Sequence, residues 1–407
     1  MFSFSKSNTK TSTSVPLLGT YIRQASHAGT WYNDDPDILT KEIITWLNNT
    51  NNNNNNNVSS SSSSESSTST STNNNINNSS TIPKEAIIHG LISPHAGYRF
   101  SGSTAAYSYN TWLTSLSLTN NNNNTSSSMV PPSSTIPHTI FIFGPSHRIP
   151  LNGLAISGAK EIETPLGNIP VNTSLIQQLF TTDIKNISYR VLSQEEDENE
   201  HSLEMHYPLI QYIIQQIYQE YPQLEKNHPI NIVPILVGTL TPNYLSYTNL
   251  LVPYFRSNSN LNSTSESTKN FFIFSSDFCH WGKRFSYTPI NKQFPTTEIY
   301  KGIELLDKEG ILILEHGNYS KFLHYLTTKK NTICGRNPLL FLLSIMEEMN
   351  KQDGNNNTST TSSSTSLVAN ISMWKIKFLH YKQSSPVQSM DDSSVSYAAG
   401  IIYSTKQ

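Results

Sequence analysis

The chain has 407 residues, with 27 lysine and arginine residues against 29 acidic ones. A net charge of -2 offers no basic surface, so neither nucleic acid nor an anionic membrane is expected as a partner. With only two cysteines, Cys279 and Cys334, the chain lacks a disulfide framework and suits a reducing compartment, the cytoplasm with or without the nucleus. From the N-terminal residues and the lengths of the apolar runs we expect neither a signal peptide nor a membrane span.

Four segments are dominated by asparagine, serine and threonine, which cannot bury enough apolar area to offset the entropy of ordering. We therefore predict disordered insertions at 48–81, 119–135, 257–268 and 353–366. Residues 1–20 are predicted to be a flexible N-terminus. The remainder of 21–407 predicts one large domain that the insertions interrupt.

In chain order, the apolar periodicity predicts alternating helices and strands. Continuous apolar runs indicate strands that are buried on both faces. The pattern predicts an α/β sandwich with a central, mostly parallel or mixed sheet that is flanked by helices. The predicted elements are a helix at 36–47, a strand at 85–93, a helix at 103–113, a strand at 138–144, helices at 174–180 and 203–220, strands at 231–238 and 270–275, helices at 298–310 and 337–350, and strands at 372–381 and 395–403.

The segments that follow three predicted strands each carry a histidine, namely His95, His147 and His280, and the third also carries Asp277. Ligands of such sheets bind outside the carboxyl ends of the strands. Neutral imidazole is the commonest protein ligand of transition metals. A single histidine of this kind is usually structural, but three together predict a metal or ligand site.

Cys334 precedes a predicted helix, and Arg336 lies close to it. A thiol near a helix N-terminus has its thiolate favoured by the helix dipole, and the thiolate is the form that binds metal or attacks an electrophile. The alternative is a small buried hydrophobic residue.

The segment DENEHSLEMHYP places His201 and Glu204 at the start of a long amphipathic helix, where they are candidate pocket groups. His206 in the same segment is interpreted as structural. Near the N-terminus, ASHAGTWY contains His27 and Trp31. We predict an anchoring role for Trp31, and His27 is open between a pocket and a structural role.

Eight motifs in order along the chain resemble the Memo-like proteins, a family named for a mediator of cell motility: ASHAGTWY, ISPHAGYRFSG, FGPSHR, DENEHSLEMH, PILVGTL, SSDFCHWG, NTICGRNP and DSSVSYAAG. The resemblance implies a fold similar to that of class III extradiol dioxygenases. It also implies a metal site at His95, His147 and Cys334, with Asp277 and His280 lining the same site. The metal expected is iron as Fe2+, with copper or zinc as alternatives.

Three functions are consistent with these residues. The first is an intracellular metal-binding protein with redox activity, which the resemblance links to cell motility signalling. The second is a non-enzymatic adaptor whose cleft binds phosphotyrosine peptides or signalling proteins, with Tyr98, Trp281, Arg148 and Arg336 supplying aromatic and cationic groups. The third is a cysteine hydrolase with Cys334 as nucleophile and His280 or His147 as base.

Overall fold

The structure is a computed structural model. The predicted insertions at 119–135 and 257–268, most of those at 48–81 and 353–366, and residues 1–17 of the predicted flexible N-terminus lie outside the described residues, so these predictions are not tested. The structure describes residues 18–58, 82, 83, 85–116, 136–181, 187–256, 269–356 and 373–405.

A large mixed sheet forms the centre of the fold, as the sequence predicts. Its strands run in the order β10, β12, β2, β9, β3, β8, β4, β7, and β11 pairs with β12. The neighbours β2, β9, β3 and β8 are parallel, whereas β12 is antiparallel to β2 and β4 is antiparallel to β8. The strands are β2 (Ala86–Ser93), β3 (Thr139–Pro145), β4 (Leu154–Ile156), β7 (Tyr189–Val191), β8 (Asn231–Val237), β9 (Asn270–Ser275), β10 (His280–Trp281), β11 (Lys375–Gln383) and β12 (Ser394–Thr405).

A second, small sheet lies beside the first and contains β1 (Tyr21–Arg23), β5 (Ala159–Ile162) and β6 (Ile169–Pro170). Because β1 pairs with β5, the N-terminal segment is held against the middle of the chain. This pairing brings Arg23 and the following loop, which contains His27, toward the carboxyl edge of the large sheet.

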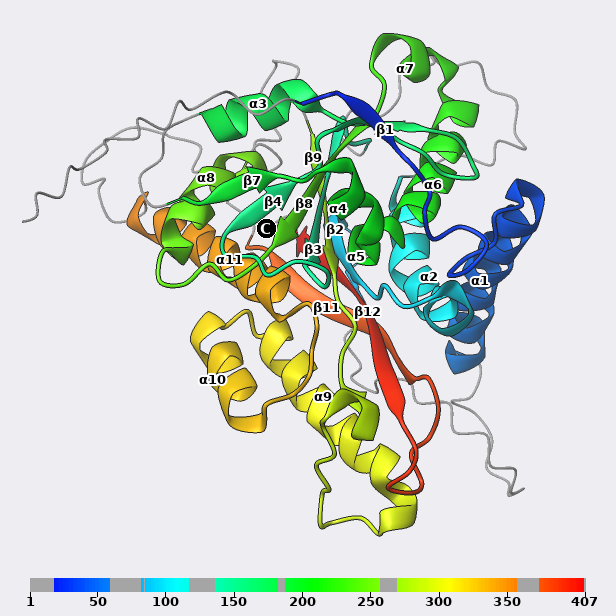
Figure 1. Ribbon diagram of the computed structural model, residues 1–407, viewed down its shortest axis with the longest axis vertical. Helices are drawn as coiled ribbons and strands as arrows, with labels where there is room; N and C mark the ends of the chain where they lie inside the picture. The colour runs from blue at the N-terminus through cyan, green and yellow to red at the C-terminus, as the bar shows by residue number, and fades with distance from the viewer. Residues whose placement is uncertain are drawn as a thin grey trace, which may run out of the picture.

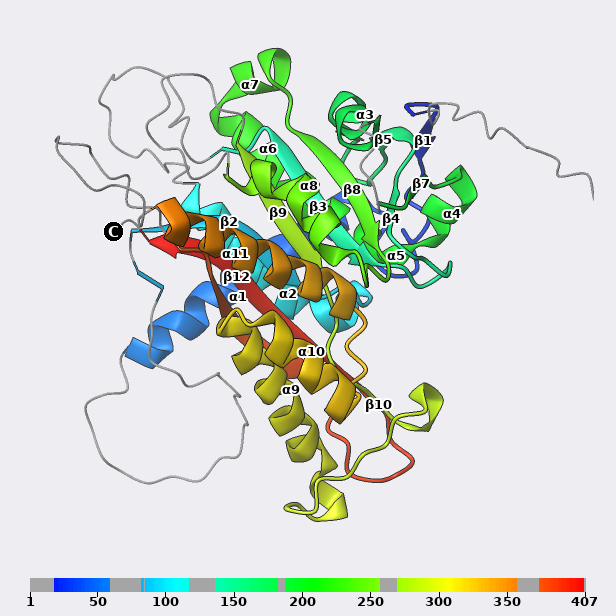
Figure 2. The same ribbon diagram turned by 90° about the vertical axis from the view of Figure 1, so that its left-hand side faces the viewer.

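Helices cover both faces of the large sheet, with α8 and α11 on one side and α1, α2 and α6 on the other (Figure 1). Figure 2 shows α9 and α10 below α11, beside β12. The helices are α1 (Pro36–Val58), α2 (Tyr98–Ser115), α3 (Thr173–Thr181), α4 (Gln194–Asn199), α5 (His201–Glu204), α6 (Tyr207–Glu220), α7 (Pro222–Asn227), α8 (Tyr244–Arg256), α9 (Ile299–Glu315), α10 (Tyr319–Lys329) and α11 (Arg336–Asn356), with 3-10 turns η1 (Lys283–Phe285) and η2 (Thr296–Glu298).

One predicted helix is wrong, and several predicted helix ends fall short of those in the structure. The helix expected at 337–350, for example, ends at Asn356, inside the range assigned to the last insertion. The single helix expected at 203–220 is two helices, α5 and α6, separated at Met205 and His206. Pro208 explains the break, since proline lacks an N–H and would clash with the carbonyl of residue 204 in a continuous helix, but fits the first turn of α6. The helix expected at 36–47 continues to Val58, into the range assigned to the first insertion.

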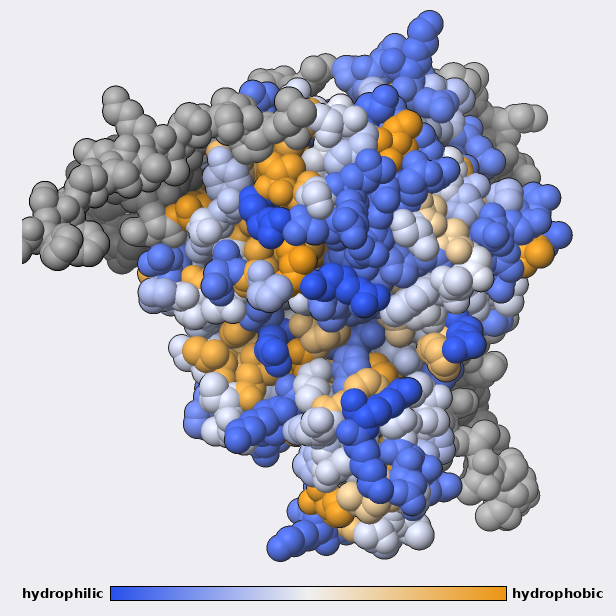
Figure 3. All heavy atoms as spheres, viewed as in Figure 1, coloured by the Kyte–Doolittle hydropathy of each residue, from blue (hydrophilic) through white to orange (hydrophobic). Residues whose placement is uncertain are grey.

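The core consists of the central strands and the helix faces that pack on them. All seven residues of β3 are buried, as its continuous apolar run predicts. On the face shown in Figure 3, hydrophobic residues occur in separate clusters among hydrophilic ones. Within the described ranges, no helix has both the length and the apolar character needed to cross a membrane.

Candidate metal site

The histidines predicted at strand ends come together at one edge of the large sheet. β2, β9 and β3 are adjacent and parallel, so the segments that follow them leave the sheet at the same edge. His95 follows β2, His147 follows β3, and Asp277 and His280 follow β9. Cys334 also lies at this edge, in the loop that precedes α11, two residues before that helix begins.

Within the site, Cys334 Sγ lies 3.1 Å from His95 Nε2. The ligand atoms of His95, His147 and Cys334 lie within 4.8 Å of one another, as do those of Asp277, His280 and Cys334. His95 is buried, whereas the side chain of His147 is 27% exposed, so the site opens to solvent beside His147. The structure therefore brings together the three residues that the family resemblance implies as ligands.

Hydrogen bonds fix the tautomer of His95. Ser275 Oγ donates to the carbonyl oxygen of Ser202 at 2.7 Å, so it must accept from its other partners. Those partners are His95 Nδ1 at 2.6 Å and His206 Nε2 at 2.8 Å. His95 therefore carries its proton on Nδ1, and the lone pair of Nε2 faces Cys334. His206 is buried and accepts from the Tyr109 hydroxyl through Nδ1 at 2.9 Å.

His147 and His280 are held in the same tautomer. His147 Nδ1 donates to Glu200 Oε1 at 2.9 Å, and the backbone N–H of His147 donates to Glu200 Oε2 at 2.6 Å. His280 Nδ1 lies 2.9 Å from the carbonyl oxygen of Phe278 and 3.1 Å from that of Thr332. Carboxylate and carbonyl acceptors at Nδ1 are the partners that metal-binding histidines usually have.

Burial controls the charges of the site. It lowers the pKa of His95 well below the usual value, and the neighbouring His147 and His201 add to this effect. Burial also raises the pKa of Asp277 to about 7 and raises the pKa of the Cys334 thiol, next to Asp277, well above its usual value. Desolvation therefore opposes the Cys334 thiolate, whereas the helix N-terminus is expected to favour it.

Glu200 stays ionised despite its burial. Desolvation alone would raise its pKa, but hydrogen bonds from His147 and electrostatic interactions with His147 and His201 lower the pKa to about 2. The Glu200 side chain also caps α5 by accepting from the backbone N–H of Ser202 at 2.9 Å. A fixed negative charge therefore lies directly behind His147.

Glu204 and His27 form a second buried layer. His27 Nδ1 and the His27 backbone N–H lie 2.7 and 2.8 Å from the Glu204 carboxylate, which also accepts from Tyr32 at 2.9 Å. Arg23 lies 2.8 Å from Glu204 and 3.2 Å from Asp197. Burial would raise the pKa of Glu204, but Arg23 and His27 lower it. This layer supports the turn that presents Glu200 and His201.

His201 lies between the ligand cluster and the N-terminal loop. Its ring stacks on His147 with centroids 4.5 Å apart, and Trp31 packs on it at the same distance. Burial lowers the pKa of His201 to about 3, and its Nδ1 has no hydrogen-bond partner among the described residues. Trp31 therefore packs on the site as well as anchoring the N-terminal loop.

Two other predicted pocket residues, Tyr98 and Trp281, are buried in the core. Tyr98 is buried against Tyr32 and Trp46, and its hydroxyl donates to the carbonyl oxygen of Met205 at 2.9 Å. Trp281 is fully buried and donates to the carbonyl oxygen of Pro289 at 2.9 Å. Both side chains are part of the core because their rings pack and their polar atoms bind backbone. Arg336 is exposed at the start of α11.

Sequence reasoning missed the residues that orient the ligands. Ser275 looked like the last residue of a buried strand, and Glu200 looked like a helix-terminal charge. Thr332 was not singled out, although its Oγ1 accepts from the His280 backbone N–H at 2.7 Å and donates to the His280 carbonyl oxygen at 2.9 Å. The one available signal was their position beside the motif histidines.

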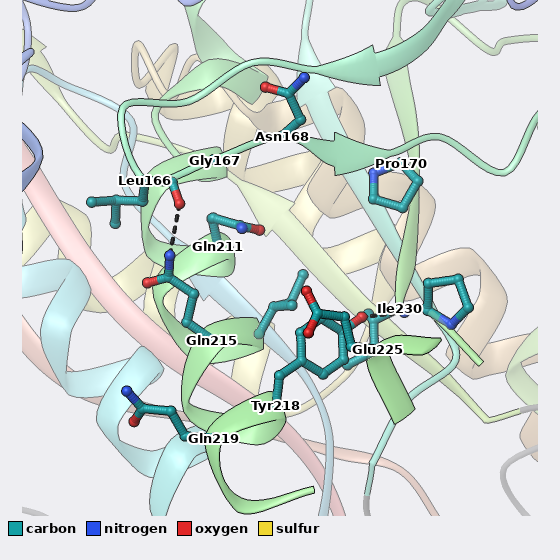
Figure 4. A pocket seen from close by; sticks show the side chains of 12 residues that line it. Leu166, Gly167, Asn168, Pro170, Gln211, Gln215, Tyr218, Gln219, Glu225 and Ile230 are labelled. Atoms are coloured by element: carbon teal, nitrogen blue, oxygen red, sulfur yellow. Dashed lines mark hydrogen bonds between the residues drawn. The ribbon is translucent and has the colours of Figure 1, made fainter. Parts of the chain in front are cut away.

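A separate pocket of about 720 Å³ lies between α6, α7 and the loop before β6 (Figure 4). Its polar lining consists mainly of amides, and Gln215 Nε2 donates to the carbonyl oxygen of Leu166 at 2.7 Å. None of the residues predicted for the metal site lines it. The lining residues are Leu166, Gly167, Asn168, Pro170, Gln211, Ile214, Gln215, Tyr218, Gln219, Glu225, Pro229 and Ile230.

The fold and the site together define a mixed α/β protein with histidine and cysteine side chains clustered at the carboxyl edge of its sheet. A family model described as "Memo-like protein" matches residues 23–401. The chain is 32% identical over 387 residues to "Protein memo-1 homolog" of Caenorhabditis elegans, covering 95% of this chain and 84% of the relative. It is 32% identical over 381 residues to "Protein MEMO1" of Homo sapiens, covering 93% and 97%. The chain belongs to the Memo-like family, as its motifs predict.

Proposed function

We propose that the protein binds a redox-active metal ion, iron or copper, through His95, His147 and Cys334, with zinc as a further alternative. The observation that carries this proposal is the shared tautomer of the histidines. His95, His147 and His280 each present Nδ1–H to an acceptor, so in the neutral imidazole the lone pair of Nε2 is available to a metal ion. Neutral imidazole nitrogens and a thiol form a donor set that suits iron, copper and zinc.

The pair of Cys334 and His95 requires only a small adjustment to hold a metal ion. Two ligand atoms on a tetrahedral ion, with bonds of about 2.0 and 2.3 Å, lie about 3.5 Å apart. Cys334 Sγ and His95 Nε2 are 3.1 Å apart in the structure. A shift of a few tenths of an ångström, together with loss of the thiol proton, would convert this hydrogen bond into two ligand bonds.

A bound iron or copper ion would supply electron transfer and Lewis acidity. The chain itself would provide the remaining functions. Ser275 and Glu200 orient the imidazoles, the open side at His147 admits a small ligand, and Asp277 is placed to hold a proton beside Cys334. Thiolate in place of a carboxylate softens the donor set, so ring-cleaving activity does not follow from the fold. The link to cell motility signalling and the binding of phosphotyrosine peptides stay predictions.

Elemental analysis tests the proposal. The protein is purified without oxygen or chelator, as wild type and as Cys334→Ser and His95→Ala variants. We expect about one equivalent of iron or copper in the wild type and a loss of at least tenfold in both variants. His324→Ala, on α10, is the control and should keep the metal. Wild-type protein without metal, or variants with unchanged metal, would refute the proposal.

The same 3.1 Å contact also favours a second candidate, a cysteine nucleophile with a histidine base. The histidine in position is His95, not His280 or His147. Against this candidate, burial raises the pKa of Cys334 and lowers that of His95, so the neutral pair is favoured. Rapid alkylation of Cys334 by iodoacetamide at neutral pH in metal-free protein would support it, and slow alkylation would exclude it.

A further inference from the structure

A buried carboxylate lies behind the metal-site loops and takes no part in the proposed ligand set. Asp307, on α9, is fully buried. Its Oδ1 accepts from the backbone N–H of Cys279 at 3.2 Å and from Asn331 Nδ2 at 2.9 Å. Its Oδ2 accepts from the Tyr381 hydroxyl, on β11, at 2.9 Å. We refer to Asp307, Cys279, Asn331 and Tyr381 as the Asp307 network.

The network joins the two loops that carry the site. Cys279 lies between Asp277 and His280 in the loop after β9, and Asn331 lies three residues before Cys334 in the loop before α11. The two loops also touch directly through Thr332, which bonds both backbone polar groups of His280. Thr332 fixes the loops at the site, and Asp307 fixes them from behind.

The network has no substitute if the carboxylate is lost. Asn331 Nδ2 donates to Asp307 and to the Tyr325 hydroxyl, at 2.9 and 2.8 Å, and both Asn331 and Tyr325 are buried. The N–H of Cys279 is also buried, because Cys279 is fully enclosed. Buried donors without an acceptor are strongly unfavourable, so the loops would move to find new partners.

We propose that Asp307 is a positioning residue of the metal site, which sets the place of Cys334 relative to His95, Asp277 and His280 by joining the two loops. This inference rests on the proposed function for its metal readout. It predicts that Asp307, which contacts no ligand side chain, controls both the metal affinity and the bond between the Cys334 thiolate and the metal.

Asparagine at 307 separates geometry from charge. In Asp307→Asn, Oδ1 still accepts from Cys279 and Asn331. The Tyr381 hydroxyl can accept from the new amide and donate to Ser396 Oγ, which lies 3.1 Å away. In Asp307→Ala, both acceptors are gone. The asparagine variant should therefore preserve the positions of the loops, and the alanine variant should not.

The test titrates full-length, metal-free protein with cobalt(II) without oxygen and follows the thiolate-to-cobalt charge-transfer band. We expect Asp307→Ala to bind at least tenfold more weakly with a reduced band, and Asp307→Asn to stay within threefold of wild type. Ile176→Ala is the control for destabilisation, since Ile176 is fully buried on α3, which starts beside the amino end of β8. It should bind as wild type. Equal affinity and band in Asp307→Ala and wild type would overturn the inference.

A second readout does not depend on metal. Alkylation of Cys334 in metal-free protein, quantified by peptide mass spectrometry to separate it from Cys279, should change at least tenfold in Asp307→Ala and stay within threefold in Asp307→Asn. If wild type binds no cobalt, the proposed function fails and the alkylation rates alone decide the inference. If Asp307→Ala does not fold, Asn331→Ala removes the other end of the link and should give the same effects. Unchanged rates would overturn the inference.

Discussion

Ser275→Ala is the substitution that tests the tautomer argument most directly. Ser275 Oγ makes three buried hydrogen bonds, to the Ser202 carbonyl oxygen and from His95 and His206. Alanine would leave one carbonyl and two imidazole N–H groups without partners. Each buried group without a partner costs about 1–3 kcal/mol, so we expect the free energy of unfolding to fall by at least about 3 kcal/mol. Metal affinity should fall about 10–100-fold, because the His95 tautomer is no longer fixed.

Ser93→Ala is the matched control. Ser93 is fully buried at the end of β2 and pairs in register with Ser275 on β9. Its hydroxyl has no hydrogen-bond partner among the described residues. Its removal should change stability by no more than about 0.5 kcal/mol or increase it. Urea unfolding of the metal-free proteins measures both variants. A Ser275→Ala variant as stable as Ser93→Ala would refute the assigned hydrogen bonds.

Three further predictions concern the buried charges. Glu200→Gln should weaken metal binding about 10–100-fold in a cobalt titration, because His147 loses its carboxylate partner. The contribution of His95 to the binding should change little, because Glu200 does not contact His95. Burial raises the Asp307 pKa from 3.8 to about 6. Between these two values the folded protein retains a proton that the unfolded chain loses. The resulting stabilisation is present in full below about pH 4 and should be lost by about pH 7. Urea unfolding at each pH should therefore show the wild type losing about 3 kcal/mol of stability relative to Asp307→Asn. Arg23→Ala should cost about 3–5 kcal/mol in thermal or urea unfolding, because Glu204 would remain buried without its cation; a loss below about 1 kcal/mol would contradict this.

The sequence predicts the ligands better than it predicts their supports. His95, His147 and His280 could be found because parallel strands end at one edge of a sheet, which turns positions along the chain into positions in space. Ser275 and Glu200 could not, because their partners lie 180 and 53 residues away in the chain and nothing local marks the contact. Trp281 was misleading for the opposite reason, since its place beside His280 says nothing about which side of the loop it faces.

The helices likewise divide into those that the sequence pattern predicts and those that it does not. α2, α9 and α11 were expected from their apolar periodicity. α8 was not predicted, and its apolar pattern is interrupted by Pro253 inside the helix. The break between α5 and α6 depends on Pro208, which sequence periodicity alone does not register. That break matters for the site, because a continuous helix would not leave Ser202 and Met205 free to bind Ser275 and Tyr98 through their carbonyl oxygens.

The charges behind the ligands constrain which ion the site would hold. A Cys334 thiolate and the Glu200 carboxylate together would carry two negative charges, whereas imidazoles that bind a metal ion through Nε2, as proposed for His95 and His147, would add no charge. A divalent ion such as iron(II) or zinc would neutralise this pair, but copper(I) would leave one uncompensated negative charge in a partly buried site, which is unfavourable at low dielectric. The softness of the thiolate has the opposite effect, because soft ligands favour copper(I). Glu200 affects the charge of the site and Cys334 affects its softness, so Glu200→Gln should shift the preference of the site toward copper(I). The iron and copper affinities of this variant, compared with those of the wild type, decide whether charge or thiolate softness has the larger effect.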